Sequence, residues 1–395
     1  MSIKELGSDC VGCLSCKHSC PMKAVKIEYN EFKSPYVKID YQKCIECGKC
    51  NSVCPVINSA TISKSNIKDL YCVFSSEEII RNSSSGGAFF TLAKQVLKEG
   101  WFVCGAVYSE DYRNVIHIVT NNLEDVMRMR GSKYIESSLK ELYSNLDEVL
   151  RSTTEKILFS GTPCQCAAIK AHYINYSERF YYVELICNGV MPPAVLEKEI
   201  NRLELEYKSE ITFYTMRFKK DSYFPLYAKA AFIDGQKWVN PFYDTPLGAI
   251  YGSRIILREC CYSCNFKGIK RYGDITLGDY HGFACDEDML RSDYGSSTVI
   301  VNNDTGEYLL KVLKDAECVS IYKARHIKEA IKSNNRLMIN GYAPCLIHRK
   351  RIKRILNKDG IVKAACYSKR FYKKRYVVIR KITERIQNRR EIDQT

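Results

Sequence analysis

The sequence predicts a small α+β module rich in cysteine, followed by one or more mixed α/β domains and a basic helical C-terminal tail. Three observations indicate this fold class. Eight of the 20 cysteines fall within residues 10–54, in two runs with the same spacing. Strand-like apolar segments alternate with helix-like segments from about residue 70 onward. Residues 346–395 contain 17 Lys or Arg against 4 Asp or Glu, whereas the first 345 residues contain 43 against 41.

The two cysteine runs have the spacing of iron–sulfur ligands. CVGCLSCKHSCP, residues 10–21, and CIECGKCNSVCP, residues 44–55, both separate their cysteines by two, two and three residues and close with proline. A structural zinc site usually has two ligand pairs separated by a longer loop, so two zinc knuckles or a disulfide scaffold are disfavoured alternatives. Residues 1–62 resemble a bacterial-type ferredoxin, an α+β module with two 4Fe-4S clusters.

The fourth cysteine of each run is expected to cross to the other cluster. Each iron has one coordination site outside its sulfides, and thiolate is the soft ligand that suits it. The predicted ligands of the first cluster are Cys10, Cys13, Cys16 and Cys54. Those of the second cluster are Cys44, Cys47, Cys50 and Cys20.

The overall composition is that of a globular protein. With 46% hydrophobic and 27% charged residues, the 395-residue chain can bury the cores of two or three domains. The sequence has no run of about eighteen apolar residues that could span a membrane, and the N-terminus MSIKELGSD lacks the apolar stretch of a signal peptide. Twenty cysteines without a secretory signal indicate thiols kept reduced for metal. We therefore expect a cytoplasmic protein.

The basic tail, residues 346–395, holds most of the net charge of +15. HRKRIKRILNK and YSKRFYKKRYVVIRKITERIQNRR interleave Lys and Arg with aliphatic and aromatic residues, as amphipathic helices do. Such a helix favours an anionic membrane surface, which places the protein peripherally on the inner membrane face, or an acidic protein partner. A basic helix that packs only on its own domain explains the pattern equally well. Nucleic acid is not expected, because no recognition module accompanies the charge.

A Ser-Gly loop precedes the first helix predicted after the module. A polar linker, residues 59–69, leads into a strand, the loop RNSSSGG at residues 81–87, a helix over 88–98 and a strand over 101–108. Bare amides and hydroxyls at a helix N-terminus suit an anion such as a nucleotide phosphate. A loop that only caps the helix is the commoner alternative.

A third group of cysteines is scattered along the chain. Cys164 and Cys187 stand at the carboxyl ends of two successive predicted strands, where open α/β sheets build their sites. Cys261 and Cys264 form a Cys-x-x-Cys pair that Cys260 precedes. Four thiolates suffice for a third 4Fe-4S cluster. Spacing alone leaves a zinc site or a set of unrelated buried cysteines open.

A series of motifs resembles the family of coenzyme F420 hydrogenase/dehydrogenase beta subunits. In order, these are SSSGG, RGSKYIES, GTPCQ, CNGV, CYSC and GDITLGD, behind the two-cluster ferredoxin. The resemblance covers roughly residues 70–340, and its motifs are specific as a set. The expected organisation is a ferredoxin domain, the N-terminal and C-terminal parts of a beta-subunit-like domain, and the tail, with bounds 1–62, 63–150, 151–345 and 346–395.

The resemblance implies FAD, a further 4Fe-4S cluster and hydride exchange with a deazaflavin coenzyme. Carried to this sequence, it gives the third cluster the ligands Cys164, Cys187, Cys261 and Cys264. It gives the flavin the contacts Ser85, Gly86, Gly87, Gly131, Ser132, Lys133, Gly161 and Thr162. Cys166 and Cys260 each neighbour one of these cysteines and are the alternative ligands.

Two departures from the family's pattern fall near the expected active site. Asn188 stands where relatives are expected to carry histidine, and Tyr280 and His281 replace an aromatic-tryptophan pair. These changes leave open whether the substrate is a deazaflavin. His281 is the one catalytic candidate, as a proton donor near a reduced flavin, and an ordinary loop histidine is the alternative.

Together these parts predict an iron–sulfur flavoprotein oxidoreductase. Clusters pass single electrons, deazaflavin and nicotinamide coenzymes exchange hydrides, and a flavin does both. The expected partners are a redox coenzyme or a partner redox protein. Two alternatives remain: an electron-delivery subunit with no organic substrate of its own, and an iron–sulfur binding or scaffolding protein without flavin.

Overall fold

The computed structural model describes residues 2–282, 284–285, 292–334, 337 and 344–392, with side chains as far as residue 371. The ferredoxin module comes first and contains an antiparallel hairpin of β1 and β2. Its elements are the short 3₁₀ helices η1 (Ile3–Glu5) and η2 (Gly7–Asp9), then α1 (Ser15–His18), β1 (Val25–Tyr29), β2 (Pro35–Ile39) and α2 (Lys49–Ser52). Leu14 and Gly48 hold equivalent positions in the two cysteine runs. Each has a left-handed backbone conformation and immediately precedes a short α-helix. The repeated spacing thus folds into a repeated local geometry.

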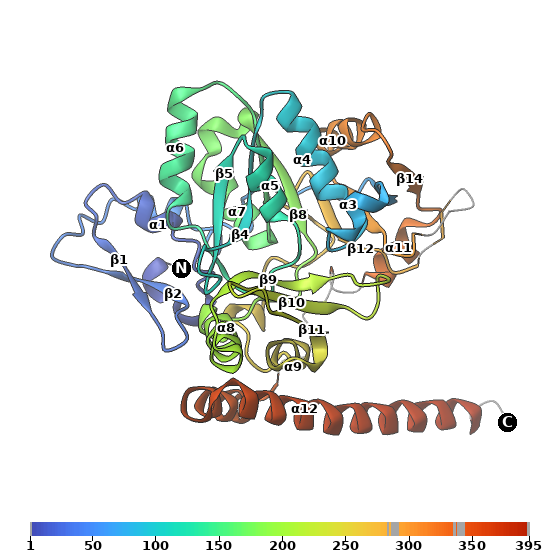
Figure 1. Cartoon of the computed structure of the whole chain (residues 1–395). Coiled ribbons are helices and arrows are strands. Elements are labelled where there is room, and N and C mark those ends of the chain that lie inside the picture. Colours follow the sequence, from blue (N-terminus) through green and yellow to red (C-terminus); the bar gives the residue numbers. More distant parts are fainter. Residues whose placement is uncertain (1, 283, 286–291, 335–336, 338–343, 393–395) are drawn as a thin grey trace.

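A nine-stranded mixed sheet forms the centre of the rest of the molecule (Figure 1), in the order β14-β3-β13-β12-β8-β7-β4-β5-β6. The strands are β3 (Asp69–Phe74), β4 (Phe102–Tyr108), β5 (Val115–Thr120), β6 (Ser137–Ser138), β7 (Ile157–Gly161), β8 (Phe180–Leu185), β12 (Ile275–Asp279), β13 (Ser297–Val301) and β14 (Ser320–Lys323). β4, β7, β8 and β12 are parallel neighbours, so their carboxyl ends share one edge. Because β4 pairs with β7, residues 63–150 and 151–345 contribute to one sheet.

Helices cover both faces of this sheet (Figure 1). One face buries α4 (Ala88–Lys98), α5 (Leu123–Met129) and α10 (Asp304–Lys314) in a common core. The other face carries α6 (Leu142–Ser152) and α7 (Pro163–His172). Ile3 and Leu6 of the ferredoxin module are buried in the same cluster as Leu142 and Phe159. The module is therefore held on the sheet by a continuous apolar core.

A smaller antiparallel sheet, β11-β10-β9, lies beneath the main sheet in the view of Figure 1. It and the segments that flank it are α8 (Pro193–Tyr207), β9 (Ile211–Phe218), β10 (Tyr227–Phe232), β11 (Lys237–Pro241), η4 (Phe242–Asp244), α9 (Pro246–Ser253) and η5 (Glu259–Cys261). The remaining elements are α3 (Glu77–Arg81), η3 (Ile174–Arg179), α11 (Ile327–Ser333) and α12 (Leu346–Ile392).

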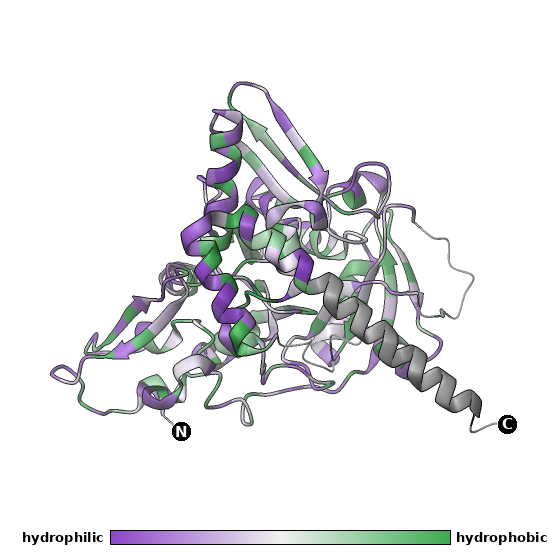
Figure 2. Cartoon of the chain, turned by 90° about the horizontal axis from the view of Figure 1, so that it is seen from below, coloured by the Kyte–Doolittle hydropathy of each residue, from purple (hydrophilic) through white to green (hydrophobic). Residues whose placement is uncertain are grey.

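The first half of α12 packs on the folded body, as in the alternative in which the basic helix lies on its own domain. Ile352, Leu356 and Ile361 are buried in the core that α8 and α9 share. Glu259 of η5 accepts from Arg349 at 2.5 Å and from Lys353 at 2.8 Å. Figure 2, seen from the side on which α12 lies, shows hydrophobic and hydrophilic residues interspersed along its coloured part. Two basic side chains of this half, Arg349 and Lys353, therefore have an intramolecular role.

None of the helices in the described ranges is long and apolar enough to cross a membrane. Residues 372–395 contain 8 Lys or Arg and 3 Asp or Glu. The expectation of binding to an anionic surface now rests on that segment, whose side chains lie outside the described part of the chain.

Two truncations test whether residues 346–371 belong to the folded body and residues 372–395 do not. Ending the chain after residue 345 removes apolar side chains whose burial contributes about 1.5–3 kcal/mol each, so we expect loss of cooperative thermal unfolding. Ending it after residue 371 keeps this core, and we expect an unchanged unfolding temperature and iron content. Salt-sensitive binding to anionic vesicles that survives in the 371 variant would contradict a membrane role for the distal segment.

Candidate metal and cofactor sites

The first cysteine pocket lies within the ferredoxin module. Cys10, Cys13, Cys16 and Cys54 line it together with apolar side chains. The structure thus brings together the four cysteines expected to hold the first cluster. Burial raises the pKa of the Cys13, Cys16 and Cys54 thiols. Clustered thiols in a dry pocket lose their protons when a metal binds, so this donor set fits a 4Fe-4S cluster.

The second cysteine set lies nearer the surface of the module. Cys50 has Cys20 and Cys44 within electrostatic reach, as expected of the second cluster. Cys47 is exposed, and the other three are half-buried. Ile45, between Cys44 and Cys47, is 60% exposed. A partner molecule can therefore reach this end of the module.

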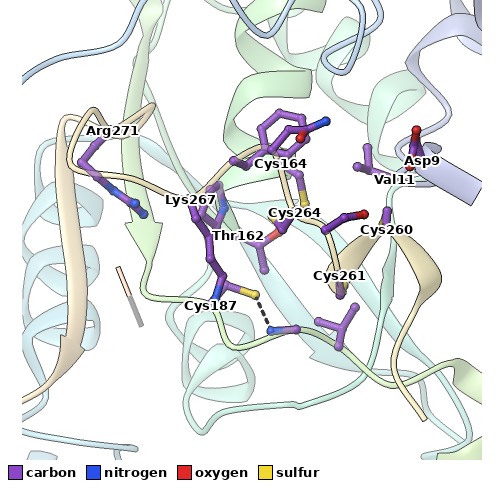
Figure 3. A pocket seen from close by; sticks show the side chains of 16 residues that line it. Asp9, Val11, Thr162, Cys164, Cys187, Cys260, Cys261, Cys264, Lys267 and Arg271 are labelled. Carbon is purple, nitrogen blue, oxygen red and sulfur yellow. Dashed lines mark hydrogen bonds between the residues drawn. The ribbon is translucent and has the colours of Figure 1, made fainter. Parts of the chain in front are cut away.

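A third cysteine pocket lies where the sheet meets the module (Figure 3). Cys164 comes from the first turn of α7, immediately after β7, and Cys187 follows β8. Cys261 ends η5, and Cys264 follows in the next loop. All four line the pocket together with Cys260. Cys164 and Cys187 meet because β7 and β8 are adjacent parallel strands, and η5 with the loop after it brings residues up to 100 positions away to the same pocket.

Two of the sulfurs in this third pocket lie in hydrogen-bond contact with the protein. The Gly189 amide donates to Cys187 Sγ at 3.3 Å, the dashed line in Figure 3. The Thr162 hydroxyl lies 3.2 Å from Cys164 Sγ. Burial raises the pKa of the Cys187 thiol to about 12, and it raises the pKa of the Cys164 thiol well above its ordinary value. Hydrogen bonds to sulfur tune the potential of an iron–sulfur cluster, so these contacts fit a redox site.

The two alternative ligands differ in their position. Cys166 is buried on the core side of α7, with its thiol 3.8 Å from Gly161 O, and it does not line the pocket. Cys260 does line it, and its thiol lies in hydrogen-bond contact with that of Cys261. Among the described residues, no three or more His, Cys, Asp or Glu side chains are placed to hold a single metal ion. The ligands of a cubane are spread over four irons instead.

The Ser-Gly loop faces the sheet more closely than the sequence suggested. A Cβ on Gly86 would lie 2.2 Å from Val73 O and 2.5 Å from Ser297 N. The Gly86 amide donates to Ser297 Oγ at 2.9 Å, and Ser85 Oγ donates to Ser296 O at 2.5 Å. Glycine is therefore required at position 86 by the strands β3 and β13, rather than by the approach of a phosphate.

Two of the expected flavin segments meet through Ser84. Its hydroxyl lies 2.8 Å from the Ser132 hydroxyl, which joins the loop before α4 to the loop after α5. Gly131 has left-handed backbone, with φ of 83°, at this meeting point. Gly87 likewise begins α4 with φ of 86°. These loops present hydroxyl groups and bare backbone together.

Two lysines hold these loops, the half-buried Lys133 and the buried Lys219. Lys133 Nζ lies 3.1–3.2 Å from the carbonyl oxygens of residues 128–131, at the end of α5. Lys219 Nζ donates to Ile80 O at 2.8 Å and to Ser85 O at 2.6 Å. Burial lowers the pKa of each lysine to about 7, helped by a neighbouring arginine. A phosphate beside these loops would favour the charged form of both lysines, which are bound to carbonyls rather than to carboxylates. The loops therefore fit the pyrophosphate of FAD.

The remaining predicted contacts lie elsewhere. Thr162 lines the third cysteine pocket. A Cβ on Gly161 would lie 2.8 Å from the Phe159 ring, so this ring occupies the space beside the glycine. Asn188 accepts from Arg254 through both its backbone and its side-chain oxygen. His281 is exposed and lines neither cysteine pocket, and its role as a proton donor stays a prediction.

Sequence reasoning did not single out three residues that contact these loops and pockets. Ser84 and Lys219 lie at the loops, and the Arg258 guanidinium donates to Cys10 O at 2.9 Å. Ser84 belongs to the SSSGG motif and stands next to Ser85, the serine that the motif predicts as the contact. Arg258 opens the RECC segment, and Lys219 follows β9 in RFKK. No local pattern distinguishes these two cations from the chain's other 58 Lys and Arg residues.

Family models match three consecutive parts of the chain. The 4Fe-4S dicluster domain matches residues 9–58. The N-terminal and C-terminal models of the coenzyme F420 hydrogenase/dehydrogenase beta subunit match residues 70–143 and 154–326. The dicluster match confirms the two-cluster module predicted from spacing.

Three individual proteins are similar to this chain over most of its length. It is 23% identical over 322 residues to a subunit of the F(420)H(2) dehydrogenase of Methanosarcina mazei, covering 78% of this chain and 82% of the relative. It is 25% identical over 291 residues to the coenzyme F420-dependent sulfite reductase of Methanocaldococcus jannaschii, covering 71% of this chain and 43% of that protein. A chain of the F420-reducing [NiFe] hydrogenase complex from Methanosarcina barkeri aligns with a TM-score of 0.48 at 16% identity, over 74% of this chain and 94% of that one.

Proposed function

Because this chain belongs to the family of coenzyme F420 hydrogenase/dehydrogenase beta subunits and carries an N-terminal 4Fe-4S dicluster domain, we propose a specific redox role for it. It is an oxidoreductase that passes electrons between its clusters and a hydride-carrying coenzyme, F420 or another carrier, through FAD. The observation that carries the proposal is the third cysteine pocket. Its lining includes Asp9 and Val11 of the ferredoxin module, and Val11 also lines the first cysteine pocket.

Bound clusters supply single-electron transfer, and bound FAD exchanges electrons both singly and in pairs. The chain's own residues hold and shield these groups. The third set, Cys164, Cys187, Cys261 and Cys264, supplies four thiolates. The Gly189 amide donates to Cys187 Sγ, and the Thr162 hydroxyl lies 3.2 Å from Cys164 Sγ. Val11 fills the space between the first and third pockets with an apolar side chain, which keeps water out of the path.

Near the flavin, Ser84 and Ser132 offer hydroxyl groups to a phosphate, and Lys133 and Lys219 supply positive charge behind them. Ser85, Gly86 and Gly87 shape the loop rather than touch the ligand. This division of roles revises the set expected from the family while keeping its location.

The proposed function is tested by anaerobic purification, with iron, sulfide and flavin counted per chain, followed by titration with reduced F420 and with NADH. Reduction of both flavin and clusters by one of these donors supports the proposal. Clusters that neither donor reduces would favour an electron-delivery subunit without an organic substrate. Clusters without any flavin would favour the binding or scaffolding alternative.

Lys219→Met tests the flavin site directly. The substitution removes the ammonium that joins Ile80 O to Ser85 O, so we expect loss of most of the FAD with iron unchanged. Lys220→Met is the matched control, because the adjacent Lys220 side chain is 59% exposed and pairs only with Asp221 at 4.0 Å among the described residues. Stoichiometric FAD in Lys219→Met would place the cofactor elsewhere.

A partner redox protein is the proposed destination or source of the electrons at the other end. Cys47 and Ile45 are exposed at the second cysteine set, and nearby Tyr41 is 66% exposed. An exposed cluster with apolar and aromatic neighbours offers the contact that single-electron exchange between proteins needs.

A further inference from the structure

Arg258 connects the first cysteine pocket to the third. Its Nε and Nη2 donate to Cys10 O at 3.1 and 2.9 Å, across 248 residues of chain. Its own carbonyl accepts from the Cys261 amide at 2.9 Å, and its amide donates to Val190 O at 2.9 Å. The side chain therefore contacts the first cysteine set while the backbone positions the third.

The guanidinium also packs against the loop that carries the first two cysteines. A Cβ on Gly12 would lie 2.7–2.8 Å from three atoms of the Arg258 guanidinium. Gly12 has φ of 69°, so glycine is required here by backbone conformation and by this close approach together. Arg258 Nη2 additionally donates to Pro35 O at 2.7 Å, which fixes the hairpin of the module.

A single carboxylate balances this buried cation. Arg258 Nη1 donates to Glu136 Oε1, and Ser34 Oγ donates to Glu136 Oε2 at 2.7 Å. Both side chains of the ion pair are 8% exposed. A buried ion pair is weak evidence for a stabilising role, because the cost of desolvation offsets the attraction. A pair placed between two sets of metal-binding thiols calls for another explanation.

We propose that Arg258 is a positioning residue for electron exchange between the first ferredoxin cluster and the third cluster, and that its charge favours the reduced state of both; this inference rests on the proposed function. The exchange moves one electron from one cluster to the other, and it makes or breaks no bond and moves no proton. The reduced cluster carries one more negative charge. A buried cation nearby lowers the energy of that state and so raises the reduction potential.

The proximity of the charge to both clusters follows from the contacts. Cys10, Cys260 and Cys261 all lie within electrostatic reach of the guanidinium. The negative charge of Glu136 partly cancels the positive field of Arg258. Removing the Arg258 charge alone therefore makes the local potential more negative, and removing the Glu136 charge alone makes it more positive. A purely structural pair would behave differently, because loosening the junction from either side would have the same consequence.

The test uses three variants of the full chain, purified without oxygen and titrated with monitoring by electron paramagnetic resonance. Arg258→Gln is expected to lower the midpoint potentials of two of the three clusters. Glu136→Gln is expected to raise them, and the double variant to return them toward the original values. We expect a change of about tenfold in the ratio of reduced to oxidised cluster at a fixed potential, which is about 59 mV for one electron.

Iron, sulfide and flavin counts separate this inference from the proposed function. If the unaltered chain binds no clusters, both are overturned. If it binds them and the midpoints of Arg258→Gln and Glu136→Gln coincide with its own, or shift in the same direction, only the role of Arg258 is overturned. Should Arg258→Gln lose iron, Glu136→Gln and Arg258→Lys still decide. Glu136→Gln must raise the midpoint potentials, and Arg258→Lys must not lower them by the tenfold equivalent, because its charge is retained.

Discussion

Cys187→Ala is expected to lower the iron content from about twelve to about eight atoms per chain, with sulfide falling in proportion. Cys187 lines the third cysteine pocket and contributes nothing to the module, so the signals of the two ferredoxin clusters should remain. The measurement is iron and sulfide per chain, together with the spectrum of the reduced protein. Flavin content is expected to persist, because the loops joined by Ser84 and Ser132 are separate from this pocket.

Cys166→Ala is the matched control for this experiment. Cys166 is two residues from Cys164 on the same helix, yet its thiol lies in the core against Gly161 O. It should retain about twelve irons. Zinc in place of iron, or an unchanged iron count in Cys187→Ala, would contradict a third cluster. Comparing Cys260→Ala with Cys261→Ala then identifies which of the paired thiols is the ligand, since only one should lower the count.

Gly86→Ala is expected to destabilise the whole sheet by about 3 kcal/mol or more, at the upper end of the usual cost of overpacking. The added methyl would meet Val73 O and Ser297 N, which belong to register partners of the β3–β13 pair. Strand backbone inside a nine-stranded sheet cannot move aside as a flexible side chain can. Chemical denaturation of the apoprotein measures the effect without reference to any cofactor.

Gly252→Ala serves as the control for this second substitution. Gly252 lies in α9, and its added methyl would meet only the Tyr243 ring, at 3.2 Å. Alanine is the better helix former by about 1 kcal/mol, so stability should change little or rise. If Gly86→Ala unfolded at the unaltered chain's midpoint but released its flavin, the loop would be a phosphate contact after all.

The spacing of the cysteines by itself determined the ferredoxin module. Cys10, Cys13 and Cys16 are close in sequence, so their relative positions follow from a few backbone turns, and the second run repeats them. The alternation of strands and helices similarly determined a mixed α/β body. That prediction is confirmed by a single sheet to which both expected parts of the domain contribute.

Only the tertiary structure decided how distant segments meet. Cys164, Cys187 and Cys261 form one pocket because β7 and β8 are parallel neighbours and η5 folds back upon them, and no spacing in the chain encodes that adjacency. The resemblance to the family implied these ligands, and their binding of a cluster stays a prediction.

The same limit explains the basic tail and the two cations that sequence reasoning missed. An amphipathic pattern shows which residues share a helix face, but not whether a membrane, a partner or the chain's own core covers that face. Ile352 and Leu356 are buried against the chain's own core, beside α9. Arg258 and Lys219 resemble surface cations in the sequence, and they became internal because buried carbonyls and one carboxylate lay within reach to satisfy them. Charge and periodicity are local properties of a sequence, whereas burial is decided by contacts between segments far apart in it.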